Sequence, residues 1–395
     1  METGKPEVIA QMNKSAIVRL LKQHERLSRA DLTRMLHMSF PSVSSNTKQL
    51  LEDNYIIEYG VSAGKDGLGR RSVLLAFNEK RGFVVGVCFN INKIITACAD
   101  LLGNPLSVVE KNMDLTKDGE YAYTLIRDSI NEVLNKSSVS LEKLECICVG
   151  IPGIFDENSQ KNRFVPYLDS WEDIQIVDRL KHDFVENVVA ENVVNLGVIG
   201  EKWRGNAQNY QNVVYIEYDV GISAGLILNG ELYCGPNGLA GEVGYIVLDP
   251  RQMAKTFSDE GALEELISGI ALSNVLNDIN DLSEEHFDIE PLILLSDNGN
   301  DRAGEMMDHV VRHIAAMIIN TVAVLNPEVV ILSGINGIQI GRRYLDVITE
   351  LVRAHVPFLP HIEISKYTGN QAGLYGALRM SIMNAASNID NEHFI

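Results

Sequence analysis

The stretch SRADLTRMLHMSFPSVSSNTKQLLED, residues 28–53, decides the fold of the first part of this chain. Leu32, Met35 and Leu36 are spaced to share the inner face of one helix. After a short turn, Val43, Leu50 and Leu51 share the inner face of a second helix. This pattern predicts a helix-turn-helix whose second helix reads DNA. An ordinary helical hairpin packed on a core is the alternative.

The outer face of the predicted reading helix is small, polar and weakly basic. Such a face suits close approach to base edges and phosphates. A proline in the first turn costs no hydrogen bond there. The residues of this helix expected to contact DNA are Ser39, Pro41, Ser42, Ser44, Ser45, Asn46 and Lys48.

Two short apolar segments follow, NYIIEYG (54–60) and SVLLAFN (72–78), and predict a β-hairpin. The loop between them is rich in glycine and ends in two arginines, which suits entry into a minor groove or a clamp on phosphates. A flexible hairpin tip with solvated charges is the alternative. We expect a wing, with DNA contacts from Gly69, Arg70 and Arg71.

The net charge of −19 is unusual for a DNA-binding protein, but it is unevenly distributed. The first 80 residues hold 12 Lys and Arg against 9 Asp and Glu, whereas the remainder holds 22 against 44. The positive excess therefore lies on the module predicted to meet DNA, and the acidic remainder would be repelled by DNA. An acidic surface that serves only solubility fits the same numbers.

Length and composition predict a cytoplasmic protein of more than one domain. A chain of 395 residues exceeds the usual size of one domain. The N-terminus lacks the apolar run of a secretory signal, and no run of eighteen apolar residues predicts a membrane span. Five cysteines, an odd number found mostly in apolar runs, favour reduced, buried thiols over disulfides.

From Gly82 onwards, short apolar strands alternate with helices, which is typical of an α/β fold. Two similar openings, near Gly86 and Tyr215, each give a strand, a turn containing glycine and another strand. The repetition predicts two lobes with a ligand-binding cleft between them. Helices are expected at residues 121–135, 195–203, 262–278, 303–325 and 342–354.

Six segments spread over the α/β part resemble the ROK family of sugar kinases and sugar-responsive repressors. They are GIPGIFD (150–156), ENVVNLGVIGEKWRG (191–205), AGLILNGELYCGPNGLAGEVGY (224–245), GALEEL (261–266), NPEVVILSG (326–334) and AGLYGAL (372–378).

The resemblance implies a two-lobed, actin-like (ribonuclease H-like) body. With the winged module in front, the layout is similar to the repressor branch of the family, of the xylose type. The expected divisions are a winged helix-turn-helix at 1–80, a first lobe at 81–190 completed by about 376–395, and a second lobe at 191–375.

Three motifs that the family's kinases need for phosphoryl transfer are changed here. The phosphate loop D-x-G-G-T corresponds to CFNIN (88–92), and the turn G-T-G-x-G corresponds to DVGIS (219–223). The catalytic aspartate of E-N-D-A-N corresponds to Val193, which cannot accept a proton. We therefore expect neither ATP binding nor kinase activity.

The zinc site of the family is also changed. Its E-x-G-H and C-x-C-G-x-x-G-C-x-E motifs correspond to residues 242–245 and 255–264. We expect no structural zinc and no other cofactor, because these side chains are poor zinc ligands. The ligand positions hold Tyr245, Lys255, Phe257 and Ala262.

The residues that bind sugar hydroxyls in the family are partly kept. Carboxylates suit polyols because they accept two hydroxyl protons with directional geometry. Alternatively, the first glutamate caps a turn and the second is a solvated helix residue, so that the site is vestigial. The expected effector-binding residues are Asn192, Glu242, Tyr245 and Glu264.

The sequence thus predicts a homodimeric or larger transcriptional repressor of carbohydrate-utilisation genes, which binds double-stranded DNA and is released by a sugar. Two alternatives stay open: an active sugar kinase with a DNA-binding appendage, and a DNA-binding dimer that takes no small ligand.

Overall fold

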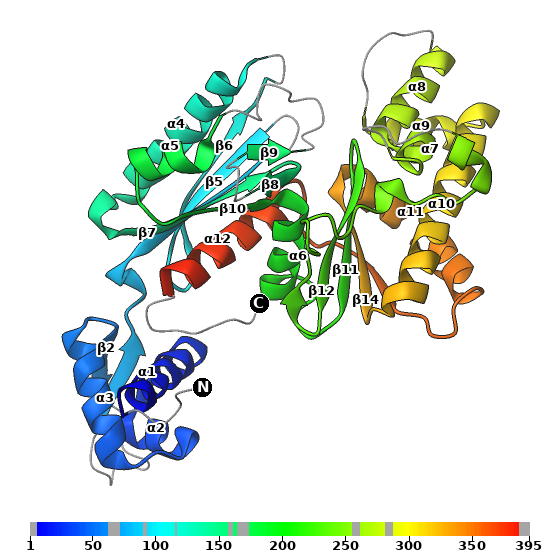
Figure 1. Ribbon diagram of the computed structural model, residues 1–395. Coiled ribbons are helices and arrows are strands. Elements are labelled where there is room, and N and C mark those ends of the chain that lie inside the picture. The colour runs from blue at the N-terminus through cyan, green and yellow to red at the C-terminus, as the bar shows by residue number, and fades with distance from the viewer. Residues whose placement is uncertain are drawn as a thin grey trace.

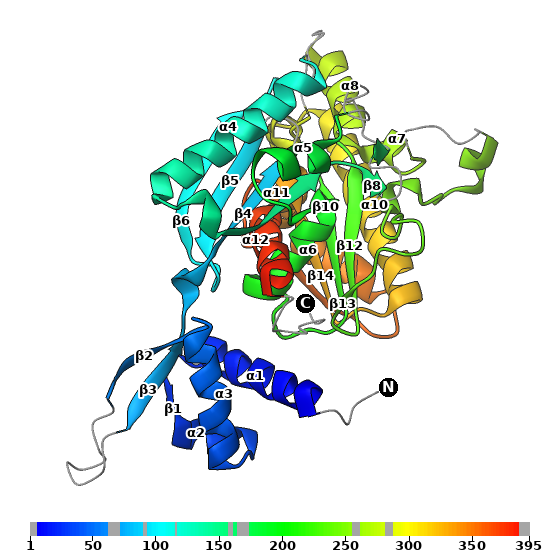
Figure 2. The same cartoon turned by 60° about the vertical axis from the view of Figure 1, so that its left-hand side comes forward.

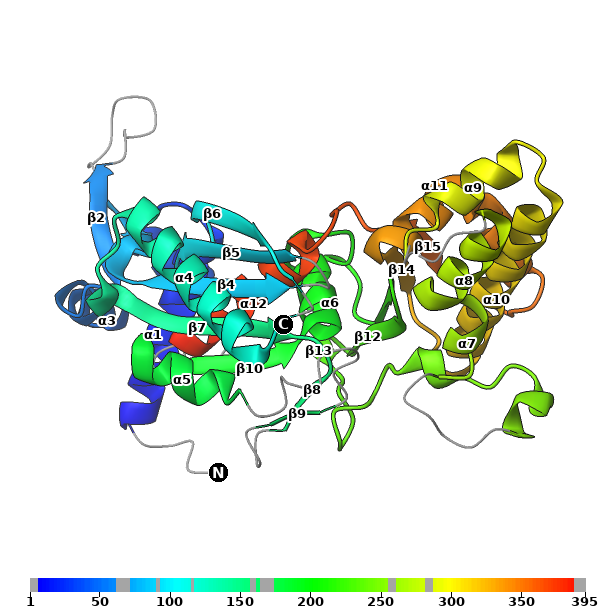
Figure 3. The same cartoon turned by 90° about the horizontal axis from the view of Figure 1, so that it is seen from above.

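The computed structural model describes residues 6–61, 72–89, 93–114, 117–156, 161–163, 174–254, 261–280 and 287–386. A small N-terminal head is joined to a body of two α/β lobes (Figure 1). The view from above shows the two lobes side by side, with α6 and α12 between them (Figure 3).

The head is a winged helix-turn-helix. It contains α1 (Pro6–Gln23), β1 (Leu27–Ser28), α2 (Arg29–Leu36), α3 (Phe40–Glu52), β2 (Ile56–Val61) and β3 (Val73–Phe77), with the strands in the antiparallel order β1-β3-β2. The predicted helix-turn-helix and hairpin strands are therefore confirmed. Its core contains Ile17, Leu21, Leu32, Val43 and Leu50, each at most 2% exposed.

Local capping fixes the two helices of the motif. Ser28 and Asp31 form a reciprocal capping box at the start of α2, and α2 ends at His37 in the left-handed conformation. Ser39 then caps α3, since its side chain accepts a hydrogen bond from the backbone N–H of Ser42. The expectation that Met35 points inward is wrong, since Met35 is 38% exposed. In this helix of eight residues, Leu32 is the buried side chain.

Lobe 1 is built on a five-stranded sheet with the order β10-β7-β4-β5-β6. Helices α4 and α5 cover one face of the sheet, and α12 covers the other (Figure 1). Its elements are β4 (Phe83–Phe89), β5 (Lys93–Asp100), β6 (Pro105–Asn112), α4 (Gly119–Ser137), β7 (Leu144–Ile151), β8 (Ile154–Asp156), β9 (Lys161–Arg163), α5 (Ile176–Asp183) and β10 (Val188–Asn192).

Lobe 2 is built on a second five-stranded sheet with the order β13-β12-β11-β14-β15. Its elements are α6 (Val193–Arg204), β11 (Val213–Tyr218), β12 (Ile222–Leu228), β13 (Glu231–Leu232), α7 (Glu264–Ile267), α8 (Gly269–Asn280), α9 (Glu290–Asp297), α10 (Asp301–Leu325), β14 (Val329–Ser333), α11 (Gly334–Arg353) and β15 (His361–Ile364). The chain then returns to lobe 1 as α12 (Gln371–Ala386).

The two sheets have the same connectivity. In each sheet the first strand pairs antiparallel with the second and parallel with the fourth, and the third and fifth strands add at the two edges. The predicted duplication is therefore confirmed. The expected helices are present, but the predicted 262–278 helix is divided into α7 and α8, and α11 begins at Gly334 instead of residue 342.

Helices α6 and α12 cross at two glycines. A Cβ atom at Gly376 would lie 1.9 Å from the carbonyl oxygen of Leu196, and a Cβ atom at Gly200 would lie 2.0 Å from that of Ala372. The backbones approach so closely that no larger residue fits without a shift. The glycines of the 191–205 and 372–378 segments therefore hold the two helices at the middle of the body.

By length and composition α10 could cross a membrane. Its apolar face, however, lies in the core of lobe 2, where Val310, Ile314 and Ile318 are at most 2% exposed.

Four of the five cysteines are buried as expected, and Cys234 is half-buried.

Candidate nucleic-acid interface and interlobe site

The outer face of α3 carries most of the residues predicted to meet DNA. Ser39, Pro41, Ser45 and Lys48 are exposed, and Ser42 and Ser44 are half-buried. Lys48 lies 3.8 Å from Glu52 one turn on, an exposed ion pair of the kind that contributes little. The face therefore presents serine hydroxyl groups, which can form hydrogen bonds, and one cation, Lys48, which can attract a phosphate.

Asn46 is an exception, and the expectation that it lies on the outer face is wrong. It is 6% exposed, and its side-chain amide donates to the backbone carbonyl of Ser42 at 2.9 Å. Val43, Asn46 and Leu50 recur at spacings of three and four, which place them on one helix face. That spacing was readable in the sequence and favoured an inward position.

The start of α3 lies at the end of the head distant from the two lobes (Figures 1 and 2). The described part of the wing is the β2–β3 hairpin, in which Tyr59 and Val61 are exposed and the guanidinium of Arg26 stacks 3.7 Å from the Tyr59 ring centroid. The predicted wing contacts Gly69, Arg70 and Arg71 lie outside the described residues.

Arg81 joins the head to lobe 1, a role that no pattern in the sequence indicates. Its guanidinium lies 3.8 Å from the ring centroid of Tyr55, just after α3, and 3.3 Å from the carboxylate of Glu145 in β7. Arg81 and Glu145 side chains are 20% and 24% exposed. Arg81 therefore helps to tie the orientation of the head to the sheet of lobe 1, in addition to the apolar cluster to which the head and lobe 1 both contribute.

Two of the expected effector residues, Glu242 and Glu264, lie close together in lobe 2. Burial, and then the charge of Glu264, raise the pKa of Glu242, while a hydrogen bond with Ser223 opposes the rise. Glu264 accepts hydrogen bonds from the backbone N–H groups of Ile222 at 2.8 Å and Gly261 at 3.0 Å. Glu264 is thus a half-buried residue that joins two segments of the chain, and not a residue with water as its only partner.

The other two expected effector residues differ in position. Asn192 caps α6: its oxygen accepts from the N–H groups of Val194 and Asn195, and its amide donates to the Gly153 carbonyl at 2.6 Å. This capping role was not anticipated from the sequence. Tyr245 is half-buried in a short 3₁₀ helix (Val243–Tyr245) that directly follows Glu242.

The turn that binds phosphate in the family's kinases is closed by a carboxylate of the chain itself. The Asp219 carboxylate accepts a hydrogen bond from the N–H of Ile335 at the start of α11, and the Asn336 amide donates to the Asp219 carbonyl at 2.9 Å. A helix N-terminus is a favourable position for an anion. In this protein, the Asp219 carboxylate already occupies the N-terminus of α11.

Glu217 lies beside Asp219 and shares its surroundings. Burial raises the pKa of both carboxyl groups, and the charge of Asp219 raises that of Glu217 further. The Tyr215 hydroxyl lies 3.2 Å from Glu217 and 2.8 Å from the Ser333 hydroxyl. Two buried carboxyl groups at this position supply no positive charge with which to bind a phosphate.

Val193 replaces the proton acceptor of the kinases, and its surroundings suit an apolar side chain. It is half-buried and packs against the apolar clusters on both sides of α6. Among the described residues, no group of three or more His, Cys, Asp or Glu side chains is arranged to hold a metal ion. Lys255 and Phe257 of the former zinc motif lie outside the described residues, so the absence of zinc stays a prediction.

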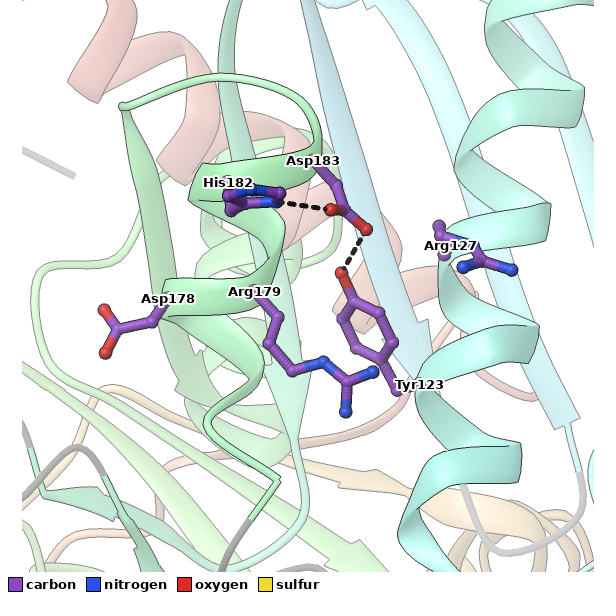
Figure 4. A pocket seen from close by; sticks show the side chains of 6 residues that line it. All are labelled: Tyr123, Arg127, Asp178, Arg179, His182 and Asp183. Carbon is purple, nitrogen blue, oxygen red and sulfur yellow. Dashed lines mark hydrogen bonds and ion pairs between the residues drawn. The ribbon is translucent and has the colours of Figure 1, made fainter.

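A cavity of about 360 Å³ lies away from these residues, between α4 and α5 on the outer side of lobe 1 (Figure 4). Two of its charged side chains already have partners: Arg179 makes two hydrogen bonds to Glu120, at 2.6 and 3.0 Å, and Asp183 accepts one from Tyr123 at 2.8 Å. We therefore do not assign the effector to it. The lining residues are Tyr123, Arg127, Asp178, Arg179, His182 and Asp183.

Comparison with known proteins agrees with this division into head and body. The model of the ROK family matches residues 91–383, and a model described as winged helix-turn-helix DNA-binding matches residues 13–57. A putative xylose repressor of Caldicellulosiruptor sp. (strain Rt8B.4) is 27% identical over 96% of this chain and 97% of its own length. The transcriptional dual regulator NagC of Escherichia coli (strain K12) is 23% identical over 84% and 82%.

Solved structures show which parts of the fold are shared. A ROK family transcriptional regulator, a homologue of the E. coli MLC protein, superposes over 95% of this chain and 97% of its own, with a TM-score of 0.77 and 20% identity. A ROK hexokinase from Thermus thermophilus covers 77% of this chain and 99% of its own, with a TM-score of 0.66 and 23% identity. Since the family model spans most of the body and a DNA-binding winged helix-turn-helix precedes it, this chain belongs to the ROK family.

Proposed function

We propose that this chain is a DNA-binding transcriptional repressor whose hold on DNA is weakened by a sugar. The observation that carries the proposal is the joining of a winged helix-turn-helix to a complete ROK body, a layout shared over nearly the full length with relatives named repressors. Carbohydrate-utilisation genes, with xylose as the first sugar to test, are the regulated class we infer, and the cytoplasm is the inferred location.

DNA would be held by two parts of the head. Helix α3 enters the major groove with its exposed serines and Lys48 facing base edges and phosphates, and the wing reaches the neighbouring backbone. A homodimer would present two heads to half-sites about one helical turn apart or a multiple of it. Backbone and wing contacts supply most of the affinity, and the residues of α3 supply the selectivity.

We further propose that the body does not transfer phosphate and needs no cofactor. Three features support this: Val193 at the position of the proton acceptor, the Asp219 carboxylate at the N-terminus of α11, and the neighbouring Glu217. An ATP-turnover assay with a panel of pentoses and hexoses tests it, and the expected rate is that of the buffer blank. Sugar-dependent release of ADP would overturn it in favour of a kinase with a DNA-binding appendage.

The sugar would bind beside Glu242 and Glu264, with Tyr245 stacking on a ring face and Asn192 lining the lobe 1 side. Glu264 already holds the loops at Ile222 and Gly261, so a ligand hydroxyl that engages Glu264 competes with these bonds and moves the loops. Such a ligand weakens operator binding by its differential affinity for the two lobe arrangements.

The test is a titration of the full-length protein on a labelled duplex selected from a random pool. Addition of the effector sugar is expected to release the duplex. Glu242→Gln should reduce the sugar response at least 10-fold with duplex affinity unchanged, whereas Glu231→Gln, an exposed glutamate of β13, should change neither. If no sugar releases the duplex and none raises the melting temperature, the effector part is wrong and a ligand-independent DNA-binding dimer remains.

A further inference from the structure

The first residue of the reading helix is a phenylalanine, and its side chain is 55% exposed. Phe40 is held at the tip of α3 by its neighbours: the Ser39 side chain caps the helix and Pro41 follows within the first turn. The N-terminal residues of a recognition helix are those that contact base edges. Phe40 is therefore placed at the part of the helix that enters the groove first.

Exposure of one apolar residue is common on protein surfaces and is not informative by itself. The informative feature is the contrast between Phe40 and the exposed residues near it. The other exposed residues of the first half of α3 and its cap are Ser39, Pro41 and Ser45, which are small, and Lys48 follows one turn after Ser45. Val43 and Leu50 are fully buried and fix the helix on the head core, so the helix cannot rotate to bury the ring without losing that core.

The chemistry of the major groove identifies the matching ligand. The apolar group that base pairs present there is the C5-methyl of thymine, whereas the other groups are hydrogen-bond donors and acceptors. Serine hydroxyls bond to several bases and do not select one strongly. A bulky apolar side chain at the tip of the helix supplies the selection that the serines lack.

We propose that Phe40 packs against a thymine methyl group in each half-site and so selects an A·T pair beneath the start of α3. The proposal rests on the proposed function, in which α3 reads the major groove. It adds the base that is read and the residue that reads it.

The test uses full-length protein and a duplex selected by the wild type from a random pool. Each thymine is replaced in turn by deoxyuridine, which removes the methyl group and leaves the pairing intact. For the wild type, one position per half-site should lose about fourfold in affinity, the ratio that corresponds to burial of one methyl group. Phe40→Ala should lose at least as much on the thymine duplex and should not distinguish thymine from deoxyuridine at that position.

Controls separate this proposal from the function on which it rests. Phe358→Ala, at a 75% exposed phenylalanine of lobe 2, should bind like the wild type and keep its sensitivity to deoxyuridine. If deoxyuridine has no effect at any position, or if Phe40→Ala retains the wild-type sensitivity, the proposal is wrong. The reader assignment itself fails only if Ser45→Ala and Lys48→Ala also leave DNA binding and sequence preference unchanged.

Discussion

The head and the body of this protein are stabilised in different ways. In the head, the deciding contacts are local: a capping box between Ser28 and Asp31, a cap at Ser39, and the packing of its three helices on an apolar core that continues into lobe 1. In the body, the deciding contact joins α6 and α12, which are far apart in the sequence and approach at Gly200 and Gly376. A locally specified head can change its outer residues freely, whereas the body tolerates little change where its helices cross.

The largest expected effect is on the head core. Leu50→Ala removes a fully buried side chain from α3 and should cost about 2–5 kcal/mol of stability. Because the head is small, this loss should unfold it and abolish DNA binding, while the body keeps its melting transition. Calorimetry with a DNA-binding titration measures both.

The matched control is Leu294→Ala, at a 56% exposed leucine of lobe 2, which should change stability by less than about 0.5 kcal/mol. A single transition that shifts as a whole in Leu50→Ala would contradict the comparison, since it would mean that head and body unfold as one unit.

The second effect concerns the helix crossing in the body. Gly376→Ala places a Cβ atom 1.9 Å from the Leu196 carbonyl oxygen, so the two backbones must separate, at a cost of about 1–3 kcal/mol. Gly304→Ala in α10 is the matched control, because its Cβ atom would lie 3.7 Å from the nearest side-chain atom. That variant should gain about 0.5–1 kcal/mol from helix propensity alone. Equal stability changes in thermal melts would refute the crossing argument.

The same difference explains how much was predictable from the sequence. The helix-turn-helix followed from local spacing and capping residues, and the duplicated α/β sheets followed from repeated strand patterns. Asn46 is buried because its spacing from Val43 and Leu50 places it on the inner face of α3, although its polarity alone favours the outer face. The Arg81 contacts and the Asp219 hydrogen bond to Ile335 were not predictable, because they depend on how distant elements meet.

A third, smaller effect is expected at the link between the regions. Arg81→Ala removes the stack on Tyr55 and the pair with Glu145, which together contribute about 1–2 kcal/mol. The head should stay folded but become less fixed, so that proteolysis near residue 80 is faster and the sugar response of DNA binding is weaker.

Arg81→Lys, which keeps the charge and loses the planar stack, should lie between the wild type and Arg81→Ala. Arg353→Ala, at an exposed arginine of α11, should have no effect. An unchanged proteolysis rate in Arg81→Ala would show that the head is oriented by other contacts.

The smallest expected effect is on the pH dependence of stability, through Glu217 in the body. Burial and the charge of Asp219 raise the pKa of this carboxyl group, and a group with a raised pKa stabilises the fold when protonated. Its contribution is therefore complete below the usual glutamate range and is lost as the pH rises through the raised pKa. Glu217→Gln should remove this loss, so that the variant gains on the order of 1 kcal/mol over the wild type as the pH rises from 5 to about 9.

Urea unfolding at several pH values measures the difference, with Glu231→Gln as the exposed control. Parallel wild-type and Glu217→Gln profiles would mean that Glu217 ionises normally in the folded protein and that its burial does not raise its pKa.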